Sequence, residues 1–315
     1  MGFARKISRD WGRHAGLIVV VLLIVSLTAL LGLSVFLSYR VVSPSRTSTE
    51  FTPDQLPSPP SAVVFSTPRG DRDGWFFPGL RGAPAVILAP GHGMHRGQLI
   101  TLAITLQDNQ YNAFVFEFTA QGSVGGMSQL GSGETQELLA AVETIISRDD
   151  VDKERIGIWG ADLGGYAAVC AAAADQRVRA FAVDSVYDSP AQMFQHLLRR
   201  NGLAALPLVS RVSGWLFALL NFSARNDPAL KERVQNMAGI GKFYVQAREN
   251  SEAAEATRQL FLASPEPRDQ LLVSRSRYAV MSSEERKAYE TGIVTFFLQR
   301  LPPVQVAPRP AGVPR

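Results

Sequence analysis

The chain has 315 residues, of which 46% are hydrophobic and 19% are charged, a composition that excludes a disordered or coiled-coil protein and supplies a sizeable core. Its net charge of +4 arises within residues 1–40, which carry five basic residues and one acidic residue, so the rest of the chain sums to zero and we predict no nucleic-acid partner. The single cysteine, Cys170, excludes an intramolecular disulfide and a multi-cysteine metal site, and no cofactor is predicted.

The first predicted element is a transmembrane anchor over residues 14–40. Residues 14–39 carry no formal charge for 26 positions between Arg13 and Arg40, and about 20 apolar residues are enough to span a bilayer. A cleaved signal peptide is the alternative, but its apolar region has about 7–15 residues and ends in small side chains, whereas Phe36 and Tyr39 stand at this end. Residues 1–13 hold four basic residues, which predicts a cytoplasmic N-terminus and a main domain on the outer, extracytoplasmic side.

Two proline-rich segments bracket the predicted folded domain. Residues 41–61 contain five prolines among Ser and Thr, which is typical of an extended linker that holds the domain away from the membrane. Residues 302–315 also contain five prolines and are predicted to form a tail. The folded domain is therefore expected over residues 62–301.

Within this domain, short apolar segments of β type alternate with helical patterns, which indicates an α/β fold with a mostly parallel sheet and helices on both faces. The predicted strands are 62–65, 75–77, 85–89, 113–118, 156–159, 180–184, 243–247 and 270–273, of which the first two form a hairpin. The predicted helices are 98–107, 134–147, 165–174, 252–262 and 283–298.

A helical, apolar-rich insertion over residues 185–240 interrupts this alternation and is predicted to form a cap. Its segment 203–222 is apolar enough to suggest a second membrane span, but Pro207 and Arg211 lie in its middle, so we expect a buried or lid helix pair. The glycine-rich segment 122–133 lacks the Lys-Ser/Thr ending of a phosphate loop and is expected to be a flexible connection.

The segment from Arg155 to Tyr166 combines a strand, a sharp turn and an alanine-rich helix, and it resembles the nucleophile elbow of the α/β-hydrolase superfamily. Gly160 and Gly164 match the two glycines of Gly-x-Ser-x-Gly, which keep the strained turn free of side chains. The resemblance to the serine aminopeptidase and dienelactone-hydrolase-like branch covers about residues 62–300. It implies an α/β-hydrolase fold, hydrolase chemistry and an oxyanion hole made by the backbone N–H groups of His92 and Leu163.

The catalytic triad that this resemblance implies is degenerate. Asp162 stands at the nucleophile position, Ser251 at the probable position of the acid, and Arg277 or Tyr278 at the position of the base. Haloalkane dehalogenases and epoxide hydrolases of the superfamily use an Asp nucleophile, but they still need a histidine base, and no histidine follows His196. Losing three roles together favours abandoned catalysis over a redesigned mechanism.

Each candidate residue also has a structural interpretation. Asp162 precedes an expected helix and is predicted to serve as its N-cap, where the carboxylate would occupy its own anion site. Glu117 and Asp184 end strands where α/β sheets bind ligands, so they are either pocket residues or turn residues. The remaining candidates are expected to be structural: His92 and His95 as solvated loop residues, His196 as an exposed helix residue and Cys170 as a buried thiol.

Two functions remain open from the sequence. The first is a membrane-anchored pseudo-hydrolase that binds a small molecule or a protein partner through the retained pocket. The second is an active hydrolase of ester, amide or carbon–halogen bonds that uses Asp162 with a displaced base. An imidazole, or two carboxylates, within hydrogen-bond reach of Asp162 would favour the second, and the sequence leaves open whether the chain is an enzyme.

Overall fold

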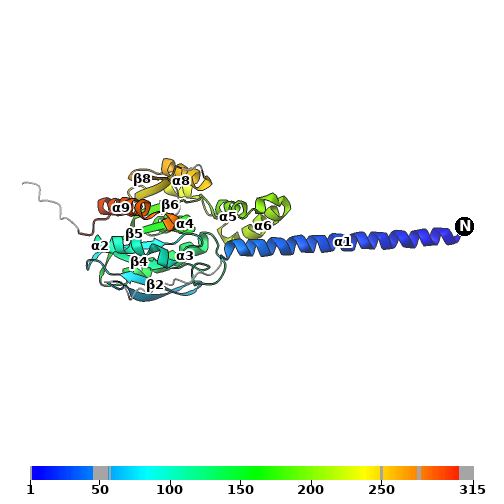
Figure 1. Ribbon diagram of the computed structural model, residues 1–315, viewed down its shortest axis with the longest axis horizontal. Helices are drawn as coiled ribbons and strands as arrows, with labels where there is room; N and C mark the ends of the chain where they lie inside the picture. Colours follow the sequence, from blue (N-terminus) through cyan, green and yellow to red (C-terminus); the bar gives the residue numbers. More distant parts are fainter. Residues whose placement is uncertain (1, 45–55, 57, 249–250, 275–277, 305–315) are drawn as a thin grey trace, which may run out of the picture.

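The computed structural model describes residues 2–44, 56, 58–248, 251–274 and 278–304. A long helix, α1 (Gly2–Val42), protrudes from an α/β domain (Figure 1). Its stretch His14–Val42 is the one helical segment in the described chain that is long and apolar enough to cross a membrane. A membrane anchor and a signal sequence both meet that criterion.

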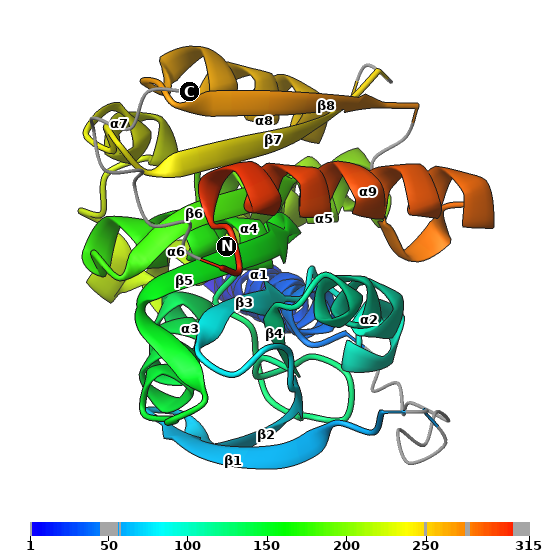
Figure 2. The same cartoon turned by 90° about the vertical axis from the view of Figure 1, so that its left-hand side faces the viewer.

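The domain is built on a sheet of eight strands in the order β1-β2-β4-β3-β5-β6-β7-β8, which Figure 2 shows from β1 at the bottom to β8 at the top. The strands are β1 (Ser61–Thr67), β2 (Gly70–Phe77), β3 (Ala83–Ala89), β4 (Asn112–Phe116), β5 (Val151–Ala161), β6 (Val178–Asp184), β7 (Gly241–Ala247) and β8 (Arg268–Val273). The hairpin β1–β2 is antiparallel, β2 joins β4 antiparallel, and all pairs from β4 to β8 are parallel. All eight predicted strands are confirmed, and the central ones are buried on both faces, as parallel strands under two helical layers must be.

Helices cover both faces of the sheet. One face carries α2 (Ile100–Asp108) and α9 (Ser283–Arg300), and the other carries α3 (Ser132–Ile146), α4 (Asp162–Ala174) and α8 (Glu252–Ala263). Short 3₁₀ turns lie at Arg96–Leu99 (η2) and Tyr278–Val280 (η5). The five predicted helices are confirmed. They form two apolar layers against the sheet, and the carboxyl ends of the parallel strands lie together at one edge.

The last turns of α1 are part of the domain rather than of a linker. Val41 and Val42 are buried in the core cluster that contains α3 and α4. The Ser43 hydroxyl donates to the Gly126 carbonyl at 2.8 Å, and the Ser128 N–H donates to the Val42 carbonyl at 2.8 Å. The prediction that a linker begins at residue 41 is therefore wrong, because the apolar side chains of Val41 and Val42 pack in the core of the domain. Pro53 and Pro57 lie outside the described residues, whereas Pro59 and Pro60 lie within them.

The insertion between β6 and β7 forms α5 (Pro190–Arg200), α6 (Pro207–Leu220) and α7 (Leu230–Gln235), with 3₁₀ turns at Leu203–Ala205 (η3) and Phe222–Ala224 (η4). Phe194 of α5 stacks on Phe217 of α6 with ring centroids 4.2 Å apart. Only one side of α6 is covered, so of the two forms expected for 203–222, a buried or a lid helix pair, the fully buried one is wrong. Trp215, Leu219 and other large apolar residues of this segment face outward.

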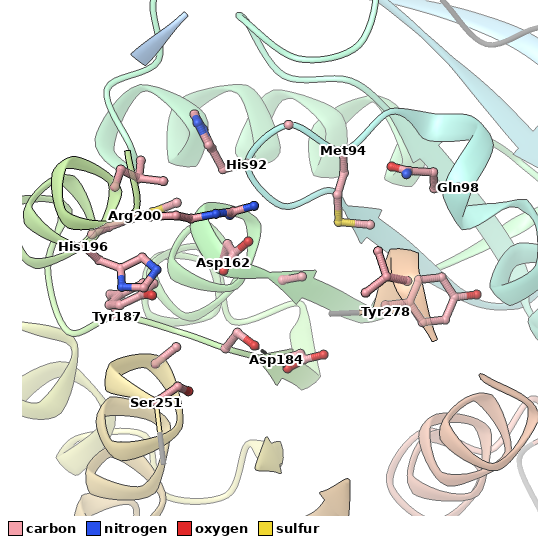
Figure 3. Close-up of a pocket in the computed structure, with 17 residues that line it drawn as sticks. His92, Met94, Gln98, Asp162, Asp184, Tyr187, His196, Arg200, Ser251 and Tyr278 are labelled. Atoms are coloured by element: carbon pink, nitrogen blue, oxygen red, sulfur yellow. Dashed lines mark hydrogen bonds between the residues drawn. The ribbon is translucent and has the colours of Figure 1, made fainter. Parts of the chain in front are cut away.

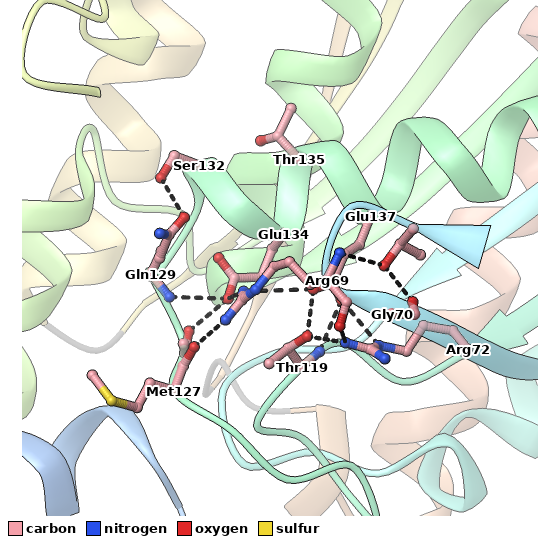
Figure 4. Close-up of polar contacts among 12 residues, drawn as sticks. Arg69, Gly70, Arg72, Thr119, Met127, Gln129, Ser132, Glu134, Thr135 and Glu137 are labelled. Atoms are coloured by element: carbon pink, nitrogen blue, oxygen red, sulfur yellow. Dashed lines mark hydrogen bonds and ion pairs between the residues drawn. The ribbon is translucent and has the colours of Figure 1, made fainter. Parts of the chain in front are cut away.

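The glycine-rich connection after β4 is held by buried carboxylates (Figure 4). Glu134 accepts from the Ser128 hydroxyl at 2.8 Å and from the Gly131 N–H at 2.8 Å. Glu137 accepts from the N–H of Thr119 at 2.8 Å and lies 3.6 Å from Nε of Arg72. Because these bonds tie both ends of the loop to α3, it is a fixed connection and not the flexible one expected from its glycines.

Candidate functional site

The turn between β5 and α4 has the backbone of a nucleophile elbow. Asp162 has a φ of +49°, in the left-handed region that a non-glycine residue rarely adopts. A Cβ on Gly160 would lie 2.3 Å from the Gly164 carbonyl oxygen, and a Cβ on Gly164 would lie 2.3 Å from the Ala89 carbonyl oxygen. Both glycines are therefore required by close backbone packing, whatever chemistry the turn performs.

Asp162 does not have the place of an N-cap. The helix α4 begins at Asp162 itself, and Ala161 stands at the N-cap position with extended backbone. The predicted cap role is therefore wrong. The elbow places the backbone of Asp162 in the left-handed region, whereas N-cap residues use the β region. The carboxylate still lies in the first turn of α4, where the helix dipole favours a negative charge.

A cavity of about 220 Å³ lies over the elbow, at the carboxyl ends of the parallel strands (Figure 3). Its lining includes His92, Met94, Gln98, Asp162, Asp184, Tyr187, His196, Arg200, Ser251 and Tyr278. Figure 3 shows Asp162 in the middle of this set, with the Arg200 side chain extending above it from α5. The cavity is smaller than the roughly 300–1,000 Å³ of pockets for drug-sized ligands, so its size suits a small ligand.

The loop after β3 stands where the resemblance implies an oxyanion hole, but several of its groups are already engaged. The Gly91 N–H donates to Sδ of Met94 at 3.2 Å, and the Gly93 N–H donates to Oε1 of Gln121 at 2.7 Å. A Cβ on Gly91 would lie 3.0 Å from Oδ2 of Asp162. The Asp162 carboxylate therefore lies against this loop, where the resemblance implies that a substrate oxygen would be stabilised.

His92 is a cavity residue and not a solvated one. Burial, followed by the charge of nearby Arg200, lowers the pKa of His92 to about 4, although a hydrogen bond with the Val41 backbone acts in the other direction. Its Nδ1 is buried without a hydrogen-bond partner among the described residues. The expectation of a solvated His92 is wrong because the end of α1 covers the loop. His95 caps the turn η2 and does not line the cavity.

A second imidazole lines the same cavity from the cap. Nδ1 of His196 lies 3.3 Å from Oε2 of Glu252, and Arg199 donates to the same oxygen at 2.6 Å. The His196 ring packs on Tyr187 with centroids 5.2 Å apart. His196 is therefore half-buried and oriented by a carboxylate, which corrects the expectation of an exposed helix position.

The two acidic candidates at strand ends have different roles. Asp184 lines the cavity and accepts from the Ser185 hydroxyl at 2.8 Å and from the Tyr289 hydroxyl at 3.2 Å. Glu117 accepts from the N–H groups of Arg96 at 3.0 Å and Ser123 at 3.1 Å. Asp184 is thus a pocket residue. Glu117 instead joins two loops, which agrees with its interpretation as a turn residue.

Comparisons with known proteins place this architecture in a family. The pattern of the Prolyl oligopeptidase family matches residues 123–199, which contain the elbow. The uncharacterized protein Rv2307c of Mycobacterium tuberculosis is 31% identical over 196 residues, which are 58% of this chain and 69% of that protein. The chain belongs to the α/β-hydrolase superfamily.

Two further members of the superfamily show the extent of the likeness. The polyketide transferase grgF of a Penicillium species is 30% identical over 42% of this chain and 47% of its own. Its crystal structure superposes on 77% of this chain and 99% of its own with a TM-score of 0.60. The esterase Pf2001 of Pyrococcus furiosus superposes on 84% of this chain and 99% of its own with a TM-score of 0.64 at 17% identity, which shows the fold alone.

The residues predicted at the superfamily's acid and base positions are engaged in structural contacts. Ser251 is the N-cap of α8, where its hydroxyl accepts from the Ala254 N–H at 3.1 Å. Tyr278 donates to Glu290 and contacts the Thr101 hydroxyl at 2.9 Å. Burial, together with the Glu290 carboxylate, raises the pKa of Tyr278 far above its ordinary value, so it stays protonated at neutral pH. Arg277 lies outside the described residues.

The cavity residues Arg200 and Tyr187 have no place in the predicted triad, and neither does Glu252, which contacts His196. Glu252 directly follows Ser251, shortly after β7. The family pattern predicts a single acid position in this segment, so it indicated Ser251 and not Glu252. Cys170 is a buried thiol as expected, and burial raises its pKa to about 11. Among the described residues, no group of three His, Cys, Asp or Glu side chains could hold a metal ion.

Proposed function

We propose that this protein is a membrane-anchored α/β-hydrolase-fold protein that does not hydrolyse substrates by the family mechanism and instead binds a small ligand or a partner through the cavity over Asp162. The observation that carries this proposal is that the residues at the described acid and base positions are engaged elsewhere. Ser251 caps a helix, and Tyr278 is held protonated against Glu290.

A carboxylate at the elbow does not complete hydrolysis without a base. An ionised Asp162 could attack a carbon centre directly and expel the leaving group, but the resulting ester would persist until an activated water attacked it. General-base assistance is worth roughly 10²–10⁴ in rate. The position after β8 from which the superfamily supplies that base carries no histidine.

The cavity walls favour a small polar ligand. Asp162 and Asp184 supply acceptors, Arg200 supplies a positive charge at the rim, and neutral His92 has an unpaired buried Nδ1. A buried polar atom of this kind is stabilised when a ligand provides its hydrogen bond. The anchor, α1, would keep this cavity close to a membrane.

Activity measurements on the full chain in a nonionic detergent test the proposal. We expect the wild type and Asp162→Ala to show the same background with p-nitrophenyl esters, peptide amides and haloalkanes. Asp162→Ser rebuilds Gly-x-Ser-x-Gly but should not label with a fluorophosphonate probe, because serine needs a base to lose its proton. Turnover by the wild type that disappears in Asp162→Ala would overturn the proposal.

The anchor is tested separately by fractionation. We expect the chain to stay with membranes after carbonate washing and to be released by detergent. Protease added outside intact cells should cut within the proline-rich segment, since the positive charges before residue 14 favour a cytoplasmic N-terminus. Cleavage only after lysis would reverse the orientation, and release by carbonate would remove the anchor.

The contact between His196 and Glu252 favours a second candidate function. It pairs an imidazole that lines the cavity containing Asp162 with an orienting carboxylate, and this is the arrangement that a displaced base requires. In that mechanism the Asp162 carboxylate would displace halide from an alkyl carbon and form an alkyl ester, or displace an alcohol from an ester carbonyl and form an anhydride. Water activated by His196 would then attack the Asp162 carbonyl carbon, release the bound product and restore the carboxylate.

Isotope labelling decides between the two functions. During multiple turnovers in ¹⁸O-water, hydrolysis of an Asp162 ester at its carbonyl carbon places ¹⁸O in the carboxylate, which mass spectrometry of the peptide detects. We expect no incorporation. Incorporation in the wild type that is lost in both His196→Ala and Glu252→Ala would establish the enzyme instead.

A further inference from the structure

The cap segment Leu206–Phe222 carries a concentration of exposed apolar side chains that the cavity does not use. Leu206, Leu208, Trp215, Leu219, Leu220 and Phe222 are between 39% and 65% exposed. They are six of the fourteen exposed large apolar residues that lie outside α1 in the described chain. None of the six lines the cavity over Asp162, so these side chains are not there to contact its ligand.

This surface lies beside α1. Figure 1 shows α6 next to the part of α1 that enters the domain. The Ser213 hydroxyl of α6 donates to the Ser34 carbonyl of α1 at 3.3 Å, and both serines are fully buried. The contact places the cap beside Ser34 of α1. The exposed apolar face of α6 is therefore next to the apolar surface of α1.

The length of α1 indicates how deep in the membrane its contact with α6 lies. Its 26 uncharged residues would extend about 39 Å at about 1.5 Å per residue, whereas the hydrocarbon core of a bilayer is about 30 Å thick. If the core begins next to Arg13, about 20 residues span it, and Ser34 falls at the opposite edge. The cap helix therefore meets α1 at the level of the lipid headgroups.

The composition of the cap also suits that level. The segment 189–226 contains four arginines and no Asp or Glu, and Arg211 and Arg225 are exposed. Exposed Trp, apolar side chains and arginines together are typical of elements in the membrane interface. With 14 residues, α6 is too short to cross a bilayer, which takes about 20 residues.

We infer that α6 and its flanking turns form a second membrane contact, in which the exposed apolar side chains of Leu206–Phe222 enter the same leaflet from which α1 emerges. This inference rests on the proposed anchor. The occupant of the surface is the lipid of that leaflet, and a second copy of the chain is the competing occupant. The contact holds the cap, and with it the cavity wall formed by α5, at the membrane surface.

Lipid quenching of site-specific probes tests the inference. The full chain is reconstituted, one copy per nanodisc, in phosphatidylcholine and phosphatidylglycerol, and NBD is attached through Leu219→Cys. The matched control is Leu262→Cys on α8, because Leu262 is 54% exposed and Leu219 is 57% exposed. Leu23→Cys reports on α1 and is measured with a deep acyl-chain quencher, because residue 23 lies near the bilayer centre. Cys170 is buried and its thiol pKa is raised to about 11, so it should label poorly, and the labelled wild type gives the background.

We expect lipids with a shallow acyl-chain quencher to quench the probe at residue 219 at least about threefold more than the probe at 262, because acyl chains contact only the first. An unquenched probe at 219 together with a quenched probe at 23 overturns this inference and leaves the anchor. Unquenched probes at both positions overturn both proposals. Shielding at 219 that requires two chains per disc and is insensitive to quencher lipids assigns the surface to a second copy.

A measurement without labels guards against a disturbed variant. Trp75 and Trp159 are buried, Trp215 is exposed, and the fourth tryptophan, Trp11, is common to the two proteins compared. Brominated lipids should therefore quench a component of the wild-type tryptophan emission that is missing in Trp215→Phe. Equal quenching of the wild type and Trp215→Phe contradicts insertion of the cap.

Discussion

Two clusters that contain acidic side chains lie near the carboxyl ends of the strands. The loop cluster is centred on Glu134 and Glu137, and the cavity cluster is centred on Asp162 and His92. In the loop cluster, Glu134 and Glu137 have every carboxylate oxygen occupied by hydrogen-bond donors. In the cavity cluster, Asp162 has a left-handed backbone and His92 has an unpaired buried nitrogen. The loop cluster also keeps one unpaired buried atom, Nε of Arg72, which lies 3.6 Å from the Glu137 carboxylate. Satisfied carboxylates give rigidity, whereas backbone strain gathers where ligands bind. The comparison supports the proposed ligand site in the second cluster.

The largest effect is expected in the loop cluster. Glu137→Ala leaves Arg72 and the Thr119 N–H buried without their acceptor, so we expect a loss of about 3–5 kcal/mol in the free energy of unfolding. Glu143→Ala is the control, because Glu143 also pairs with an arginine, Arg177, but is exposed, and such pairs contribute about 0–1 kcal/mol. Urea midpoints of the full chain in detergent measure both. Equal losses would mean that the loop cluster contributes no more than a surface ion pair.

The cavity cluster should make stability depend on pH. The folded-state pKa of His92 is lowered to about 4 from 6.5, so the unfolded chain binds a proton first as the pH falls. Above pH 6.5 the residue contributes nothing to the pH dependence, and from there to about pH 4 the free energy of unfolding should fall by about 1.4 kcal/mol per pH unit.

His92→Asn should remove this slope while other acid-sensitive groups keep theirs, so the difference between wild type and variant isolates it. His95→Gln is the matched control from the same loop. A wild type and a His92→Asn variant with parallel stability curves between pH 6.5 and 4 would show that His92 is solvated after all.

Ser251 tests whether the acid position now serves the fold. Ser251→Ala removes the acceptor for the Ala254 N–H and should cost about 0.5–2 kcal/mol, as N-cap losses do. Ser251→Asp should keep the stability because Asp caps equally well, and it should create no esterase activity although it restores a carboxylate at this position. Activity in Ser251→Asp would show that the site lacks only its acid.

The strands, helices and elbow could be predicted because each depends on local patterns. The apolar runs of β3 to β7, and Gly160 and Gly164 around Asp162, specify backbone geometry directly. Contacts between distant segments could not be predicted in this way. The burial of Val41 and Val42, the cover of α1 over His92, and the pairing of His196 with Glu252 join residues far apart in sequence, and no local pattern carries that information.

The smallest effect concerns the strain at Asp162 and separates the backbone from the carboxylate. A non-glycine residue in the left-handed region costs roughly 1–2 kcal/mol, and glycine avoids that cost. Asp162→Gly and Asp162→Ala both lose the charge at the start of α4, a contribution of roughly 0.3–1 kcal/mol, but only Gly relieves the φ of +49°. We therefore expect Asp162→Gly to be more stable than Asp162→Ala by about 1 kcal/mol, with Asp162→Asn close to the wild type. Urea midpoints of the four proteins decide the matter. Equal stability of the Gly and Ala variants would mean that the elbow relaxes, and the strain that marks the cavity cluster would no longer distinguish it from the loop cluster.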